Sequence, residues 1–286
     1  MEKQKRKLIF DTSAINAFAD DLDRKAIIEG LCIVYQVGIT ETVLSEIVAN
    51  SEEGRRRELL DLLKRLLGCG KCILPFHWII EAHAKEYQAD QGAYEWRKLN
   101  VRFPQAENEI ARQEIVHSVS DETRAHNQQT NRSYLEIFRK AKPAFDKIFE
   151  GRKERPTLKE VTEHLLAEGG AHLVIGADLV ERATKTRPTE AEVKDFVKRC
   201  DPFRALLVTL CFSQYDLCIR GENVESLGKA GRLDMFSAVY TPYCAVFVTN
   251  DEGQCKAITE VARLAGLDPS VVMYPAFKES LFGLKH

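Results

Sequence analysis

The sequence has no surplus of positive charge, because its 41 Lys and Arg residues are balanced by 43 Asp and Glu residues. A chain that attracts nucleic acid over its whole surface is usually basic, so any nucleic-acid-binding surface here must be local. The chain also lacks an uninterrupted apolar run long enough to cross a membrane. The charged opening MEKQKRK leads directly into Leu8 without the apolar segment of a signal peptide. We therefore expect a cytoplasmic protein with no membrane partner.

A disulfide framework and the common histidine motifs are missing as well. The eight cysteines lie in distant segments, mostly inside apolar runs, which is typical of buried thiols in a reducing compartment. Cys69 and Cys72 have the spacing of a zinc knuckle and His77 is near, but no second CxxC pair exists, so structural thiols are favoured over zinc. The seven histidines form neither an HExxH motif nor a triad-like group.

What the sequence does have is an alternation of strand and helix patterns at both ends, and its 44% hydrophobic content is ample for a core. The first third favours three βα units, with a turn at Gly38, and the last sixty residues resume the pattern. Such alternation predicts an α/β fold with a parallel sheet covered on both faces. The expected strands are Leu8–Phe10, Ile33–Tyr35, Cys72–Leu74, Ala245–Val248 and Val271–Tyr274, and the expected helices are Ile15–Leu22, Val43–Val48, Glu52–Leu67, Trp78–Tyr87, Leu233–Tyr240 and Glu252–Ala265.

The middle of the chain, from about Tyr94 to Gly221, shows almost no strand pattern. It contains two capping boxes, in which Thr157 and Thr189 are each followed three residues later by Glu. We therefore predict an all-helical insertion at residues 93–225, and a discontinuous α/β domain made of residues 1–92 and 226–286.

Four acidic residues carry the functional argument. Asp11 and Asp251 each follow a predicted buried strand, and the carboxyl ends of parallel strands are where open α/β sheets place their ligand-binding residues. Glu46 and Asp234 lie inside apolar stretches near helix starts, where an unpaired acid is costly. A cluster of such acids is tolerable if a cation neutralises it, and hard oxygen ligands select Mg²⁺ or Mn²⁺.

The four acids lie in segments that resemble, in order, the acidic motifs of PIN-domain ribonucleases. The segments are Phe10-Asp11-Thr12-Ser13, Val43-Leu44-Ser45-Glu46, Leu233-Asp234-Met235-Phe236-Ser237-Ala238 and Phe247-Val248-Thr249-Asn250-Asp251. The resemblance implies a PIN-like parallel sheet of four or five strands flanked by helices. It also implies a Mg²⁺- or Mn²⁺-dependent endonuclease that hydrolyses phosphodiester bonds, with all four acids as metal ligands and catalytic residues. Thr12 or Ser13, and Thr249, are implied as supporting residues. Asn250 is either a further oxygen ligand or a turn residue.

Other interpretations stay open at this stage. Asp11 and Asp251 would each suit the N-cap of the following helix, and Glu41 and Glu52 compete with Glu46 for the second acid. A phosphotransferase of the haloacid-dehalogenase type would need a second Asp where Ser13 stands. A degenerate PIN-like module that binds RNA or a protein without catalysis is the alternative outside the enzymes.

The expected substrate is nucleic acid, RNA rather than DNA, and a protein partner that inhibits or regulates the enzyme is a further hypothesis. One group of basic residues in the insertion suits phosphate contact, although it equally suits the solvated face of an amphipathic helix. Its residues are Arg139, Lys140, Lys142, Lys147, Arg152 and Lys153. Another basic group surrounds Arg55-Arg56-Arg57.

Overall fold

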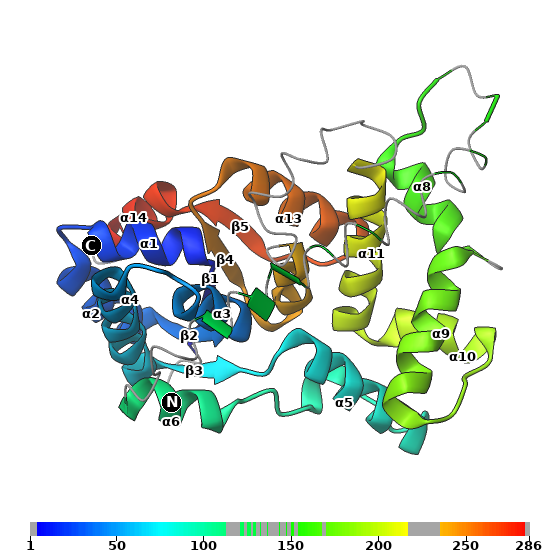
Figure 1. The fold of residues 1–286 in the computed structure, drawn as a ribbon, viewed down its shortest axis with the longest axis horizontal. Helices are drawn as coiled ribbons and strands as arrows, with labels where there is room; N and C mark the ends of the chain where they lie inside the picture. Colours follow the sequence, from blue (N-terminus) through cyan, green and yellow to red (C-terminus); the bar gives the residue numbers. More distant parts are fainter. Residues whose placement is uncertain are drawn as a thin grey trace.

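A single five-stranded parallel sheet organises the molecule (Figure 1). The computed structural model describes residues 5–112, 121–122, 125–126, 128–129, 132, 136, 143, 147, 150–151, 154–167, 170–216 and 235–283. The strand order is β3-β2-β1-β4-β5, and every pairing is parallel. The predicted α/β class, with a parallel sheet flanked by helices and joined to a helical region, is confirmed. The strands are β1 (Arg6–Phe10), β2 (Tyr35–Thr40), β3 (Gly70–Ile73), β4 (Val246–Thr249) and β5 (Ser270–Met273).

The sheet is buried on both faces, and the last three residues of β1, Leu8 to Phe10, show why consecutive residues of a strand are apolar here. Leu8 and Phe10 point into one hydrophobic core, whereas Ile9 between them points into another, because successive side chains of a strand alternate. The core around Leu8 is formed with α1 (Thr12–Asp20), α2 (Arg24–Val34), α3 (Glu41–Val48), α4 (Glu53–Leu66) and α14 (Tyr274–Gly283). The core around Ile9 is formed with α11 (Asp201–Tyr215), the 3₁₀ helix η5 (Ser237–Tyr243) and α13 (Glu252–Leu264).

The helical region has a third core of its own. There α9 (Ala171–Thr184) and α10 (Glu190–Arg199) pack with α11 and with α5 (Phe76–Ala89), and these helices lie at the right of Figure 1. Both capping boxes are confirmed, at the starts of α8 (Leu158–Leu165) and α10. Two short 3₁₀ helices complete the described elements: η1 (Leu67–Cys69) directly precedes β3, and η2 (Trp96–Lys98) follows α5. Among the helices of the described ranges, none is long and apolar enough to cross a membrane.

Two helices pack against the part of the molecule on the other side of the domain boundary that the sequence predicts at residue 92. α6 (Pro104–Arg112) lies within the predicted insertion, yet its Ala106 and Ile110 belong to the core on the Leu8 side of the sheet. Conversely, α5 comes before the insertion in sequence but contributes Ile80 and Ala84 to the helical core. α5 therefore links the two parts by packing rather than by sequence position.

The second strand differs from the sequence prediction. Ile33 and Val34 end α2 instead of starting a strand, and Ile33 is largely exposed. Gly38, expected in a turn, lies inside β2, where a Cβ atom would stand 2.6 Å from Cδ1 of Ile73 and 3.1 Å from Cγ1 of Ile9. Glycine is used here for close packing between strands and not for a chain reversal. The helix expected at Leu233–Tyr240 is 3₁₀ from Ser237 onward.

Candidate functional site

The sheet has a topological switch point between β1 and β4. The chain leaves β1 toward β2 on one side and leaves β4 toward β5 on the other, so the connections diverge above this pair of strands. Open α/β sheets bind ligands in the crevice that such divergence creates at the carboxyl ends of the strands. Asp11 directly follows β1, and Asp251 follows β4 after one intervening residue. Both predicted aspartates therefore stand at the edge where a ligand is expected.

Asp11 is nearly inaccessible and its carboxylate is fully engaged. It is 4% exposed, and it caps α1 by accepting a hydrogen bond from the backbone N–H of Ala14 at 2.7 Å. The hydroxyl of Thr249 donates to its Oδ2 at 2.6 Å, and the hydroxyl of Ser13 lies 2.9 Å from both oxygens. The capping interpretation of Asp11 is thus confirmed, and the contact with Thr249 adds a partner from the neighbouring strand.

The two hydroxyls are oriented by the backbone that follows β4. The N–H of Asn250 donates to Oγ of Ser13 at 2.7 Å, and the N–H of Asp251 donates to Oγ1 of Thr249 at 3.0 Å. A hydroxyl has one proton to donate, so amides that fill its acceptor positions leave that proton for Asp11. Ser13, in the first turn of α1, and Thr249, at the end of β4, therefore both hold the carboxylate in place.

Burial decides the acidity of Asp11. Loss of hydration raises its pKa to about 6, while the hydrogen bonds from Thr249, Ala14 and Ser13 lower it and the charge of Glu46 raises it again. The desolvation effect outweighs three favourable hydrogen bonds. At neutral pH, ionisation of Asp11 therefore lowers the stability of the folded protein.

Glu46 and Glu41 extend the acidic edge along α3. Both side chains are partly buried, and the charge of Glu46 raises the pKa of Asp11 and that of Glu41. Glu52, the other rival from the sequence, is exposed and stands before α4 without capping it by its side chain. The sequence left Glu41 and Glu46 as alternatives, whereas in the fold both are partly buried on α3 and the charge of Glu46 acts on Glu41. Glu41 directly follows β2 just as Asp11 follows β1, and that pattern was available in the sequence.

These three acids have no Lys or Arg partner among the ion pairs of the described residues. Several other partly buried acids lie against a cationic side chain, since an unpaired charge loses hydration without compensation. The neutralised pairs include Asp21 with Lys278 at 2.8 Å, Glu107 with Arg102 at 2.7 Å and Asp201 with Arg204 at 2.6 Å.

The remaining predicted site residues are less closely involved. Asp251 is exposed and caps α13 by accepting a hydrogen bond from the N–H of Gln254 at 2.8 Å. Asn250 contributes its backbone N–H to Ser13, and Thr12 accepts from Asn16 through its carbonyl. Lys147 is exposed. Asp234, Arg139, Lys140, Lys142, Arg152 and Lys153 lie outside the described residues.

Within the residues that the structure describes, no group of three or more His, Cys, Asp and Glu side chains is arranged to hold a metal ion. This result excludes a preformed protein cage from the described part of the edge.

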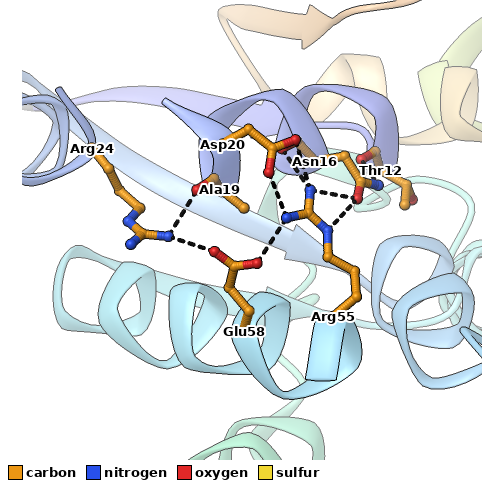
Figure 2. A network of polar contacts seen from close by, with 7 residues as sticks. All are labelled: Thr12, Asn16, Ala19, Asp20, Arg24, Arg55 and Glu58. Atoms are coloured by element: carbon orange, nitrogen blue, oxygen red, sulfur yellow. Dashed lines mark hydrogen bonds and ion pairs between the residues drawn. The ribbon is translucent and has the colours of Figure 1, made fainter. Parts of the chain in front are cut away.

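Arg55 has a structural role in the described fold. Its guanidinium binds both carboxylate oxygens of Asp20 at 2.6 and 3.0 Å, Glu58 at 2.8 Å and the backbone carbonyl of Asn16 at 3.0 Å (Figure 2). Arg24 adds a second contact to Glu58 at 3.0 Å. These bonds join α4 to α1, the helix that Asp11 caps. Arg55 therefore helps to position the site, and its charge is already compensated.

Comparison with known proteins adds nothing to this geometry, since no family model, curated protein or solved structure matches the chain.

Proposed function

We propose that the protein is a Mg²⁺- or Mn²⁺-dependent endonuclease whose site is the acidic edge at Asp11. The observation that carries the proposal is a buried carboxylate at the topological switch point, beside further acids that lack a cationic partner. Such an arrangement is destabilising unless a cation joins it. The resemblance of the four acidic segments to PIN-domain ribonucleases supports the same function, with RNA as the favoured substrate. The scattered cysteines favour the cytoplasm as the place of action.

Asp11 and Glu46 would hold the cation, together with Asp251 and Asp234 if these turn toward it. A divalent cation at such a site activates a water and offsets charge on the scissile phosphate. The protein's own part is to fix the donors. Thr249, Ser13 and the N–H of Ala14 hold the Asp11 carboxylate in one orientation, so little reorganisation is needed when the substrate phosphate arrives.

The test is cleavage of single-stranded RNA and DNA oligonucleotides by wild type and Asp11→Asn, in Mn²⁺ and in EDTA. Wild type should cut RNA in Mn²⁺ and lose activity in EDTA. Asp11→Asn should lose about a hundredfold or more, because removing a cation ligand forfeits several kcal/mol of charge stabilisation. Glu52→Gln is the matched control, since Glu52 is an exposed acid that makes no side-chain cap bond to α4, and it should cut like wild type.

The same assay separates the proposal from its alternative. Equal cutting by wild type and Asp11→Asn would refute the site. Wild type that binds RNA but cuts neither polymer would show a binding module instead, with the acids serving only as helix caps.

A further inference from the structure

Trp78 lies in the first turn of α5, which starts at the same edge of the sheet as Asp11. Thr40 of β2 pairs with Ile73 of β3, and continuing the register of β1 and β2 by two residues places Asp11 in that row. The chain leaves β3 after Ile73 and begins α5 at Phe76 (Figure 1). Adjacent strands lie about 4.8 Å apart, so roughly 10 Å separates the ends of β1 and β3. The first turn of α5 therefore stands beside the proposed site.

Trp78 is more exposed than the stability of the fold alone would favour. Its exposed fraction is 46%, and a tryptophan side chain carries one of the largest apolar surfaces of any residue. The other tryptophan of the chain, Trp96, is partly buried and packs against Tyr243. Trp78 is also the one aromatic residue among the large hydrophobic side chains that are exposed in the described ranges, which are Leu22, Ile33, Trp78 and Val174.

Two ring contacts fix the orientation of the Trp78 side chain. Trp78 meets Phe103 edge to face, with 5.4 Å between the ring centroids and 71° between the planes. Phe103 is itself held beside β3, because its N–H donates to the carbonyl of Cys72 at 2.9 Å. The ring of His77 lies 5.9 Å from that of Trp78, at an angle of 74°. The indole is thus oriented before any ligand arrives, which lowers the entropy cost of binding to it.

The surroundings of Trp78 suit a nucleobase better than a protein partner. The first turn of α5 contains no acidic residue, so a phosphate beside the ring meets no like charge from that turn. Glu81, farther along α5, is paired with Lys85 at 2.5 Å. None of the other exposed large hydrophobic side chains of the described ranges lies on α5, so Trp78 is not part of a broad apolar face. A single exposed aromatic ring instead offers a flat face on which any base can stack.

We propose that Trp78 is a base-stacking residue that holds one nucleotide of the substrate a short distance along the strand from the scissile phosphodiester. This inference rests on the proposed function, because the acidic edge supplies the chemistry and Trp78 positions the chain. Loss of the ring should weaken substrate binding about fivefold to a hundredfold, the range expected for one stacked base. The loss should appear in KM and leave kcat nearly unchanged, because the ring touches no reacting atom.

The experiment measures binding of a short single-stranded RNA in EDTA, by anisotropy of a labelled RNA and by tryptophan emission. Trp78→Ala should bind the RNA about fivefold to a hundredfold more weakly than wild type, whereas Trp78→Phe, which keeps a ring for stacking, should stay within about threefold. Val174→Ala, the control at an exposed apolar residue of α9, should bind like wild type. An oligonucleotide of the same length without bases should bind wild type and Trp78→Ala equally.

Tryptophan emission reports on the ring directly, because the chain has two tryptophans. RNA should quench the emission of Trp96→Phe, in which Trp78 remains. RNA should leave the emission of Trp78→Phe unchanged, because only Trp96 remains there. If Trp78→Ala does not fold, an unquenched Trp96→Phe overturns the stacking role by itself.

The cleavage assay in Mn²⁺ separates this inference from the proposed function. Trp78→Ala that binds RNA like wild type, or that loses as much affinity for the oligonucleotide without bases, overturns the stacking role. Trp78→Ala that cuts RNA with an unchanged KM also overturns it and leaves the nuclease intact. Wild type that binds RNA through Trp78 but cuts no polymer supports the stacking role and refutes the nuclease. Wild type that neither binds nor cuts RNA overturns both.

Discussion

Replacing Asp11 with asparagine should make the metal-free protein more stable at pH 8. In the native chain, burial raises the pKa of Asp11 from 3.8 to about 6, so above pH 6 the fold must hold a desolvated carboxylate. Asparagine removes the charge, and its amide oxygen can still accept the capping bond from the N–H of Ala14. The site would then trade stability for function, as acids poised to bind a cation do.

The magnitude follows from the shift in pKa. About two units correspond to roughly 3 kcal/mol of charge burial, at 1.36 kcal/mol per unit. The shift in pKa already includes the hydrogen bonds to the carboxylate, but the NH2 group of asparagine cannot accept the bond that the Thr249 hydroxyl donates to Oδ2, which offsets about 1 to 2 kcal/mol. We expect a net gain of about 1 to 2 kcal/mol in the free energy of unfolding.

The pH dependence gives the prediction its sign. Between about pH 4 and pH 6 the folded chain binds a proton at Asp11 that the unfolded chain has released. The contribution of Asp11 to wild-type stability is therefore full below pH 4 and lost as pH rises through 6. The advantage of Asp11→Asn should be absent at pH 4, grow through this window and stay constant above pH 7.

Urea unfolding in EDTA at pH 4, 6 and 8 measures this difference. Asp251→Asn is the matched control, because Asp251 also caps a helix after a strand but is exposed, and it should change stability by less than about 0.5 kcal/mol. Added Mn²⁺ should stabilise wild type more than Asp11→Asn. The explanation by burial would be refuted if Asp11→Asn were less stable than wild type at pH 8, or if its gain in stability were as large at pH 4 as at pH 8.

Three further substitutions test other parts of the fold by denaturant unfolding. Arg55→Ala should destabilise the protein by about 1 to 3 kcal/mol, because it removes the bonds between α1 and α4. The control Arg57→Ala loses one exposed ion pair within α4 and should change the stability by less than about 0.5 kcal/mol. Equal effects of the two substitutions would contradict the structural role of Arg55. Gly38→Ala should destabilise by about 1 to 3 kcal/mol through the clash with Ile73, and Ile73→Val in the same chain should recover part of that loss. Burial lowers the pKa of His172 to about 4, so its share of stability is lost as pH falls from 6.5 to 4. At pH 4.5 the free energy of unfolding of His172→Leu should accordingly exceed that of wild type by up to about 3 kcal/mol. An unchanged acid-unfolding transition would show that His172 does not contribute to the loss of stability at low pH.

Local sequence patterns were sufficient for most helices and strands. The capping boxes of α8 and α10 appear where Thr and Glu stand three residues apart, because both bonds of the box form within one turn. Asp11 and Asp251 could be placed at one edge because each ends an apolar strand and parallel strands share their direction. The fold class follows from the same alternation.

Tertiary packing decided what one segment cannot encode. Ile33 and Val34 have strand propensity but extend α2, and Gly38 looks like a turn but fits between Ile9 and Ile73. Thr249 could be assigned a supporting role by resemblance, but its 2.6 Å bond to Asp11 joins residues 238 positions apart.

The acidity of the site is likewise a property of the folded chain. An acid in a sequence is assigned its ordinary pKa, and only burial in the fold separates Asp11 and Glu41 from the exposed Glu52. The compensated charge of Arg55 also emerges only when α1 meets α4. The sequence by itself determined which residue types could do chemistry at the sheet edge. Desolvation, which requires the whole fold, decided which of the acids have a raised pKa.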